Sequence, residues 1–289
     1  MEQLSRTELY GWVLNSENNI FLESIENSRI REILFEYREI FFTTLRFNLQ
    51  ILRDIEINYI STTQDKDEKR VAWTNEEFRA RFEENLEEVS EHYGNDREKT
   101  YRIFADEITN SPNSYYAFNK LIKQLDKTSN EWLGDLYKYI EAKGNNYYVN
   151  DLSRENQVFL SYAYEDRLYT LCLYIFMYSK GINLYVDWLF CNGLSSGVYI
   201  KENLYKELMH SEQFLFLRTI NSELQIKGNK SIRGWCSWEM GVFYERGFSE
   251  KYYLELYSRP DRKVGTVGSL QLDGLRKLTN IHTRRLHSI

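Results

Sequence analysis

The chain has 289 residues, of which 42% are hydrophobic and 28% are charged, so its composition is that of a globular protein and not of a disordered or fibrous one. Its 43 acidic residues outnumber its 37 basic ones, and the net charge of −6 argues against a protein that neutralises a nucleic-acid backbone. Three widely spaced cysteines and four histidines give neither a disulfide framework nor a zinc-ligand spacing, which indicates a cytoplasmic protein without a metal. No signal peptide is visible, and the most apolar stretch, 168–190, contains Lys180 and Asp187, so no membrane span is expected.

The first 150 residues are predicted to be helical. Apolar residues recur at steps of three and four between Ile30 and Leu49, which is the period of one buried helical face. Thr74 and Glu77 then form a capping box for a helix over 75–93. Shorter helices are predicted over 96–109, 113–127 and 130–142. We interpret residues 1–150 as an all-α domain with a regulatory or sensing role.

The polar segment 144–156 is predicted to be a linker, because the apolar period changes after it. Strands are predicted over 158–163, 182–186, 214–217 and 252–257, and helices between them over 165–179, 199–210 and 231–246. Alternating strands and helices favour an α/β domain over 156–289 with a parallel sheet and right-handed crossovers. In such sheets ligands bind at the carboxyl ends of the strands.

Common cofactor and catalytic motifs are not found. The segment Gly228-Asn-Lys-Ser231 has the end of a phosphate-binding loop without its first glycine, and Gly265 to Gly268 is not a dinucleotide fingerprint. Cys172 is better explained as a core residue than as a nucleophile, since no partnered base is evident.

One segment, 231–241, carries chemistry. Trp235 and Glu239 lie four residues apart on a predicted helix, so they share one face. The commoner outcome of this pattern is a surface glutamate beside core tryptophans. The alternative is a carboxyl group in a partly dry pocket, where desolvation raises its pKa and an apolar cleft is open to a ligand.

The second half of the chain, through this segment and two earlier ones, resembles a TIR (Toll/interleukin-1 receptor) domain. Val158–Asp166 is similar to the opening strand of that family with its Ser-Tyr exit. Asp187 closes the second strand ahead of a loop to Gly197, and the pattern of Ser231, Trp235, Cys236 and Glu239 is similar to the helix of those TIR domains that cleave NAD. The three boxes occur in the family's order and spacing, and together they cover about 158–257.

The resemblance implies a flavodoxin-like parallel sheet of order 2-1-3-4-5 and cleavage of the nicotinamide–ribose bond, with NAD as the substrate and no cofactor. Glu239 takes the place of the catalytic glutamate. The residues expected to border the substrate are Ser161, Tyr162, Asp187, Trp188 and Trp235. Two departures are visible: the third strand ends in Leu217-Arg-Thr219 where the family has a serine-containing turn, and no apolar fifth strand follows Pro260, which predicts a short or rebuilt edge.

We therefore expect an NAD glycohydrolase that forms ADP-ribose or a cyclic product, by family analogy in bacterial anti-phage defence or cell suicide. The resemblance also implies self-association through TIR domains, and we expect a protein trigger to act on the helical half. Trp188, Leu189 and Phe190 would form an exposed apolar patch for that assembly unless they fold back onto the sheet. Two other functions stay open, a TIR scaffold without activity and a deoxyribosyl-transfer enzyme that acts on free nucleosides.

Overall fold

The computed structural model divides into two compact units. The first, called the helical unit here, is Glu39–Ser129, and the second, the α/β unit, joins Met1–Arg38 to Asn130–Ile289. The structure describes residues 4–15, 28–63, 84, 86, 89–110, 114–143, 157–190, 197–226, 229–245, 250–256, 274–282 and 285–287. The predicted linker at 144–156 and most of the predicted helix at 75–93 lie outside these residues.

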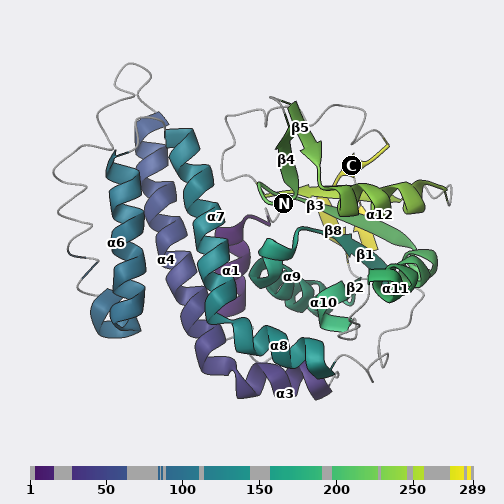
Figure 1. The fold of residues 1–289 in the computed structure, drawn as a ribbon, viewed down its shortest axis with the longest axis horizontal. Coiled ribbons are helices and arrows are strands. Elements are labelled where there is room, and N and C mark those ends of the chain that lie inside the picture. The colour runs from purple at the N-terminus through teal and green to yellow at the C-terminus, as the bar shows by residue number, and fades with distance from the viewer. Residues whose placement is uncertain are drawn as a thin grey trace. The chain divides into compact units, whose positions relative to one another are not determined.

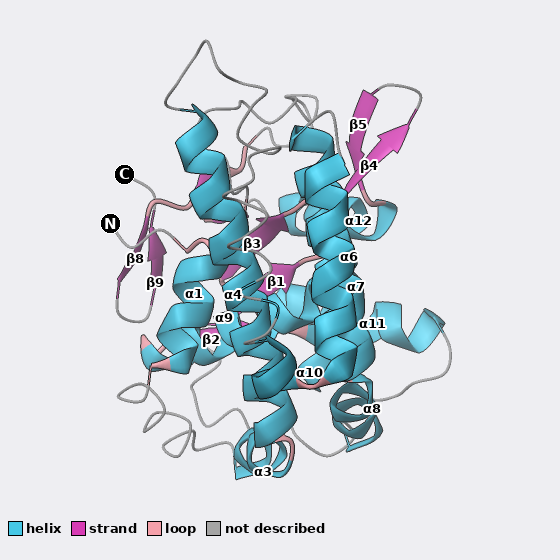
Figure 2. Ribbon diagram, turned by 90° about the vertical axis from the view of Figure 1, so that its left-hand side faces the viewer, coloured by secondary structure: helices cyan, strands magenta, loops and turns pink. Residues whose placement is uncertain are grey.

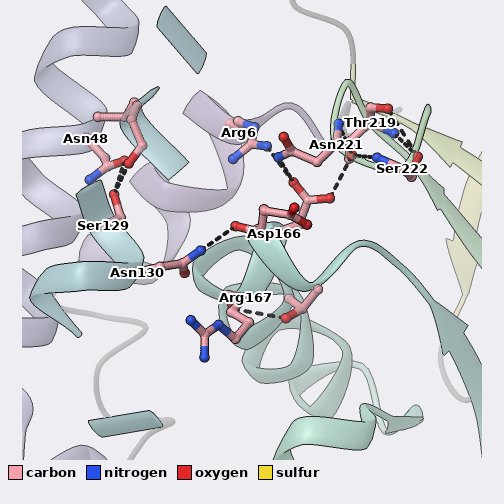
Figure 3. Close-up of polar contacts among 12 residues, drawn as sticks. Arg6, Asn48, Ser129, Asn130, Asp166, Arg167, Thr219, Asn221 and Ser222 are labelled. Atoms are coloured by element: carbon pink, nitrogen blue, oxygen red, sulfur yellow. Dashed lines mark hydrogen bonds and ion pairs between the residues drawn. The ribbon is translucent and has the colours of Figure 1, made fainter. Parts of the chain in front are cut away.

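The helical unit contains α6 (Asn95–Asn110) and most of α4 (Arg38–Thr63) and α7 (Ser114–Trp132), in agreement with the helices predicted over 96–109 and 113–127. Aromatic and aliphatic side chains fill its core, among them Phe41, Leu45, Phe47, Tyr101, Phe104 and Leu125. Two buried side-chain hydrogen bonds cross the unit. Arg97 Nη2 donates to Thr44 Oγ1 at 3.3 Å, and Ser129 Oγ donates to Asn48 Oδ1 at 3.1 Å (Figure 3). These bonds join α4 to both α6 and α7.

A five-stranded, all-parallel sheet forms the centre of the α/β unit (Figure 1). Its strands are β1 (Gln157–Ser161), β2 (Asn183–Tyr185), β3 (Gln213–Arg218), β6 (Lys251–Glu255) and β7 (Arg276–Lys277), in the spatial order β2-β1-β3-β6-β7. Counted along the chain this is the expected order 2-1-3-4-5. Every residue of β1 and β3 is buried, so the sequence shows these strands as continuous apolar runs. The edge strand β7 has two residues, which fits the missing apolar fifth strand.

Helices cover both faces of the sheet. α9 (Arg167–Ser179) packs against β2, whereas α11 (Gly197–His210) and α12 (Gly234–Glu245) pack against each other and against β1. Figure 1 shows the sheet between α9 and α12. In the described ranges, no helix is both long and apolar enough to cross a membrane.

Three helices from the first half of the sequence belong to the α/β unit: α1 (Arg6–Leu14), α3 (Ser28–Glu36) and α8 (Gly134–Lys143). α1 begins at a capping box between Ser5 and Glu8 and packs on α9, where the Trp12 ring meets Phe176 edge-on with 5.0 Å between ring centroids. The Tyr169 hydroxyl also donates to the Leu4 carbonyl at 2.9 Å. Because α1 covers α9, the residues of α9 from Arg167 to Met177 are buried all round.

Two antiparallel ribbons lie beside the sheet (Figure 2). One pairs β4 (Glu223–Ile226) with β5 (Asn229–Ile232), and the other pairs β8 (Asn280–His282) with β9 (Arg285–His287). The helix predicted over 231–246 is therefore wrong at its start. Ser231 and Ile232 pair with Leu224 and Glu223 in the first ribbon, and the helix begins only at Gly234.

Candidate functional site

The exit of β1 brings Ser161 against Glu239. Ser161 is the last residue of the buried strand β1, and its Oγ donates to Glu239 Oε2 at 2.6 Å. Glu239 comes from α12, 78 residues further along the chain, and is only 4% exposed. The surface-glutamate explanation is thereby excluded, and two predicted site residues are shown to be in contact.

Helix α12 turns Glu239 inward through the spacing of its apolar residues. Cys236, Met240 and Phe243 lie three or four residues apart along the same side and are buried. The Cys236 thiol donates to the Tyr162 carbonyl at 3.4 Å, which holds the helix against the exit of β1. Trp235, one turn before Glu239, is 43% exposed, and its ring lies 5.5 Å from that of Trp238. An accessible aromatic pair thus borders a buried carboxyl group.

Burial raises the pKa of Glu239 well above its usual range, because the carboxylate loses its hydration. Hydrogen bonds from Ser161 and Trp235 act in the opposite direction, and the negative charge of Asp187 adds to the increase. Glu239 therefore binds a proton more readily than an ordinary glutamate. A positive charge placed next to it would favour the ionised form.

A second carboxyl group lies at the same edge of the sheet. Asp187 follows β2 and opens the short helix α10 (Asp187–Phe190). Its Oδ1 accepts a hydrogen bond from the Tyr162 hydroxyl and another from the Trp188 backbone N–H at 2.7 Å. Burial raises the pKa of both Asp187 and Tyr162. The predicted residues Ser161, Tyr162, Asp187 and Glu239 are thus brought together at the carboxyl ends of β1 and β2.

Trp188 does not line this arrangement. It is 4% exposed, its Nε1 donates to Thr170 Oγ1 at 3.0 Å, and its ring meets Tyr137 of α8 with 5.0 Å between centroids. Leu189 and Phe190 are buried too, so the expected apolar patch folds into the chain instead of facing solvent. A contact between Trp188 and a substrate stays a prediction, one that requires α10 to move. The rest of that loop, 191–196, is outside the described residues.

Asp166 is a buried residue near this site for which the sequence analysis predicts no role. It ends the 3₁₀ turn η4 (Tyr164–Asp166) after β1, and three side chains from elsewhere converge on it (Figure 3). Arg6 Nη2 of α1 pairs with its Oδ1 at 3.1 Å, while Thr219 Oγ1 and Asn221 Nδ2 donate to it at 2.6 and 2.7 Å. Burial raises the pKa of Asp166, and Arg6 and the hydrogen bonds oppose that increase.

The turn after β3 explains how Thr219 and Asn221 reach Asp166. Ser222 Oγ accepts from the Thr219 backbone N–H at 2.8 Å, and Thr219 Oγ1 accepts from the backbone N–H groups of Asn221 and Ser222 at 3.1 and 3.0 Å. The turn after β3 therefore contains a serine, Ser222, which lies three residues beyond Thr219, where the sequence analysis notes a departure from the serine-containing turn of the family. Its Thr-x-Asn-Ser pattern is the signal that could have identified it.

The two residues beside Asp166 tie the same loop to other elements. Glu165 forms a bidentate ion pair with Arg233, the residue before α12, at 2.7 and 2.8 Å. Arg167 lies between the rings of Tyr137 and Tyr164, at 4.0 and 3.9 Å from their centroids. The loop that carries Tyr162 is therefore fixed on both sides.

Within the described residues, no three His, Cys, Asp or Glu side chains are grouped so that they could hold a metal ion. Comparison of the chain with protein-family models, with curated proteins and with solved structures finds no match. The function is therefore argued from the geometry of the site.

Proposed function

We propose that the protein is an NAD glycohydrolase that breaks the nicotinamide–ribose bond, with Glu239 as the catalytic residue. The observation that carries the proposal is the Ser161–Glu239 pair, a buried carboxyl group held at 2.6 Å by a hydroxyl at the carboxyl end of the central strand. Ligands of open parallel sheets bind at this edge. The strand order of the sheet is the one expected from the resemblance to TIR domains.

The charge of the site favours a cationic substrate. In the part of the chain that the structure describes, neither Glu239 nor Asp187 forms an ion pair, and both have raised pKa values. The nicotinamide ring of NAD is positively charged, so its binding would offset the desolvation of Glu239 and favour the carboxylate. The exposed face of Trp235 offers a surface on which such a planar cation can stack.

The reaction needs what this site supplies. Nicotinamide leaves as a neutral molecule and takes the bonding electron pair, so its departure requires no strong acid. The ribosyl group becomes cation-like in the transition state, and a carboxylate in a dry site stabilises that charge strongly. Water as the acceptor gives ADP-ribose, and an atom of the same nucleotide gives a cyclic product. A role in anti-phage defence is the biological part of this proposal and rests on the resemblance alone. A protein trigger that acts on the helical half is proposed because an unregulated NAD hydrolase would be toxic.

The first test compares Glu239→Gln with the wild type in nicotinamide release from NAD. Glutamine keeps the shape and the hydrogen bond to Ser161 but removes the charge, so turnover should fall at least ~10²-fold, or about 2.7 kcal/mol of barrier.

Glu207→Gln is the matched control for that test. Glu207 is also 4% exposed, but its Oε2 bonds to Gln157 at the amino end of β1. The turnover of the Glu207→Gln variant should equal that of the wild type. A wild type that releases no nicotinamide, or a Glu239→Gln variant of full activity, contradicts the proposal.

A further inference from the structure

Two consecutive residues at the exit of β1 each hold one carboxyl group, and the two groups come from different elements. Ser161 donates to Glu239 of α12, and Tyr162 donates to Asp187 of α10. The side chains of successive residues near a strand end point to opposite faces of the sheet. Ser161 and Tyr162 therefore hold the two carboxyl groups on either side of the carboxyl end of β1. Glycoside-cleaving sites that use two carboxyl groups give them separate tasks.

Asp187 has one fixed oxygen and one free one. Both of its hydrogen bonds, from the Tyr162 hydroxyl and the Trp188 N–H, go to Oδ1. Its Oδ2 accepts no hydrogen bond from any residue in the described ranges, and the side chain is partly exposed. The buried Trp188 anchors α10 through its bond to Thr170, so the free oxygen has a defined direction.

Resting on the function proposed above, we propose that Asp187 is a second catalytic residue, which accepts the proton of the hydroxyl that attacks the ribosyl cation, and that Tyr162 is its positioning residue. In this step an oxygen lone pair of water forms the bond to C1′ of the ribose. The O–H bond breaks, and its proton passes to Asp187 Oδ2 and then to solvent. Glu239 stabilises the cation and takes no proton from the acceptor.

The environment of Asp187 suits a general base. Burial raises its pKa from the usual range of an aspartate, while the Tyr162 and Trp188 hydrogen bonds keep part of that increase in check. A base is most effective when its pKa lies near the working pH, so an increase in the pKa of Asp187 favours this role. Asp187 is more accessible than Glu239, as a group that meets an incoming water must be.

The inference separates two classes of acceptor. Water and alcohols lose a proton when they attack, so they need the base. The nitrogen of a free pyridine has no proton to lose, so its attack needs only the cation that Glu239 stabilises. Asp187 should therefore matter for transfer to oxygen and not for transfer to a pyridine.

The experiment gives the full-length protein NAD together with 3-acetylpyridine and measures two rates, formation of ADP-ribose and formation of the exchanged dinucleotide. Asp187→Asn keeps an oxygen that can accept from Tyr162 and Trp188, so the site should stay folded. Hydrolysis should fall by about 10²-fold, while pyridine exchange should stay within about threefold of the wild type. Tyr162→Phe should reduce hydrolysis by about tenfold, again without loss of exchange, and change the pH dependence of hydrolysis.

Two further variants calibrate the result. Glu239→Gln should lose both reactions, and the exposed Asp135→Asn on α8 should lose neither. Equal loss of hydrolysis and exchange in Asp187→Asn, or loss of neither, would overturn the role of Asp187 and leave the glycohydrolase proposal standing. A wild type that transfers only to nitrogen would overturn both the role of Asp187 and the hydrolase part of the proposed function. A wild type without either reaction would overturn both proposals.

Discussion

The two ends of the parallel sheet use buried polar groups in different ways. At the amino end, glutamine side chains form hydrogen bonds with the neighbouring elements. Gln157 Nε2 donates to Glu207 Oε2 at 2.9 Å and to Ser211 Oγ at 3.0 Å. Gln213, the first residue of β3, donates to Glu250 at 2.7 Å and exchanges hydrogen bonds with the backbone of Leu286. This end joins β1 and β3 to α11 and to the β8–β9 ribbon.

At the carboxyl end lie three carboxyl groups whose pKa values are raised by burial, those of Asp166, Asp187 and Glu239. Of these, Asp166 has a cation, Arg6, while the described partners of the other two are hydroxyl and N–H groups. Burial of an acidic side chain lowers the free energy of unfolding, and such groups with perturbed pKa values occur most often at functional sites. The two ends therefore differ in how their buried polar groups are stabilised, and three changes test whether this difference matters for stability and activity.

The largest effect is expected from Arg6→Ala. Removal of the cation leaves Asp166 buried beside Thr219 and Asn221 with no compensating charge, and breaking such a pair costs about 3–5 kcal/mol. Urea unfolding should show this loss. Lys138→Ala, which breaks a pair whose side chains are 79% and 85% exposed, should change stability by no more than about 0.5 kcal/mol. A loss below about 1 kcal/mol in Arg6→Ala would show that Asp166 does not depend on its cation.

A smaller loss is expected from Gln157→Ala at the amino end. The substitution leaves the buried Glu207 carboxyl without its amide donor, which costs about 1–3 kcal/mol. Nicotinamide release at 25 °C should stay within about twofold of the wild type, because the change lies at the other end of β1 from Ser161. If turnover fell while stability did not, the two ends would not be separate in function.

The smallest effect is a gain of stability in Glu239→Gln that depends on pH. The folded pKa of Glu239 is raised, so the folded protein holds its proton more tightly than the unfolded chain, and the wild type loses stability as pH rises above about 4.3. Glutamine resembles the protonated acid and has no such loss. The free energy of unfolding of the variant should match that of the wild type near pH 4 and exceed it at pH 8. Thermal unfolding at several pH values measures the difference, and a variant less stable at pH 8 would contradict a desolvated carboxylate.

The sheet could be predicted from the sequence because of how parallel strands are buried. β1 and β3 are covered on both faces, so Val158–Leu160 and Phe214–Leu217 stand out as apolar runs of strand length. Ser161 and Glu239 could be assigned to one site only through the resemblance to TIR domains, since 78 residues separate them. Their direct contact was not predicted. The β4–β5 ribbon was missed because the pairing of Ser231 with Leu224, and not a local period, decides its structure.

The Arg6–Asp166 contact had no sequence signal. An arginine on a short helix is usually solvated. The local sequence does not indicate that Arg6 is buried against Asp166, a residue 160 positions further along the chain. Whether Trp188 is exposed or buried could not be predicted for a similar reason. Its burial depends on contacts with Thr170 and with Tyr137 of α8, which precedes the predicted linker in the sequence. Both features depend on tertiary contacts that periodicity does not record.

The attachment of α1 to α9 and Asp166 has a consequence for the order in which the chain is made. The whole helical unit lies in the sequence between α1 and the residues that receive it. At roughly 5–20 residues per second, the roughly 170 residues from Arg6 to Phe176 take on the order of 10–35 s to be synthesised. We expect the helical unit to finish folding during that time, while α1 waits with Tyr10 and Trp12 uncovered. The nascent chain thus exposes the aromatic side chains of α1 until α9 has emerged and α1 can pack on it.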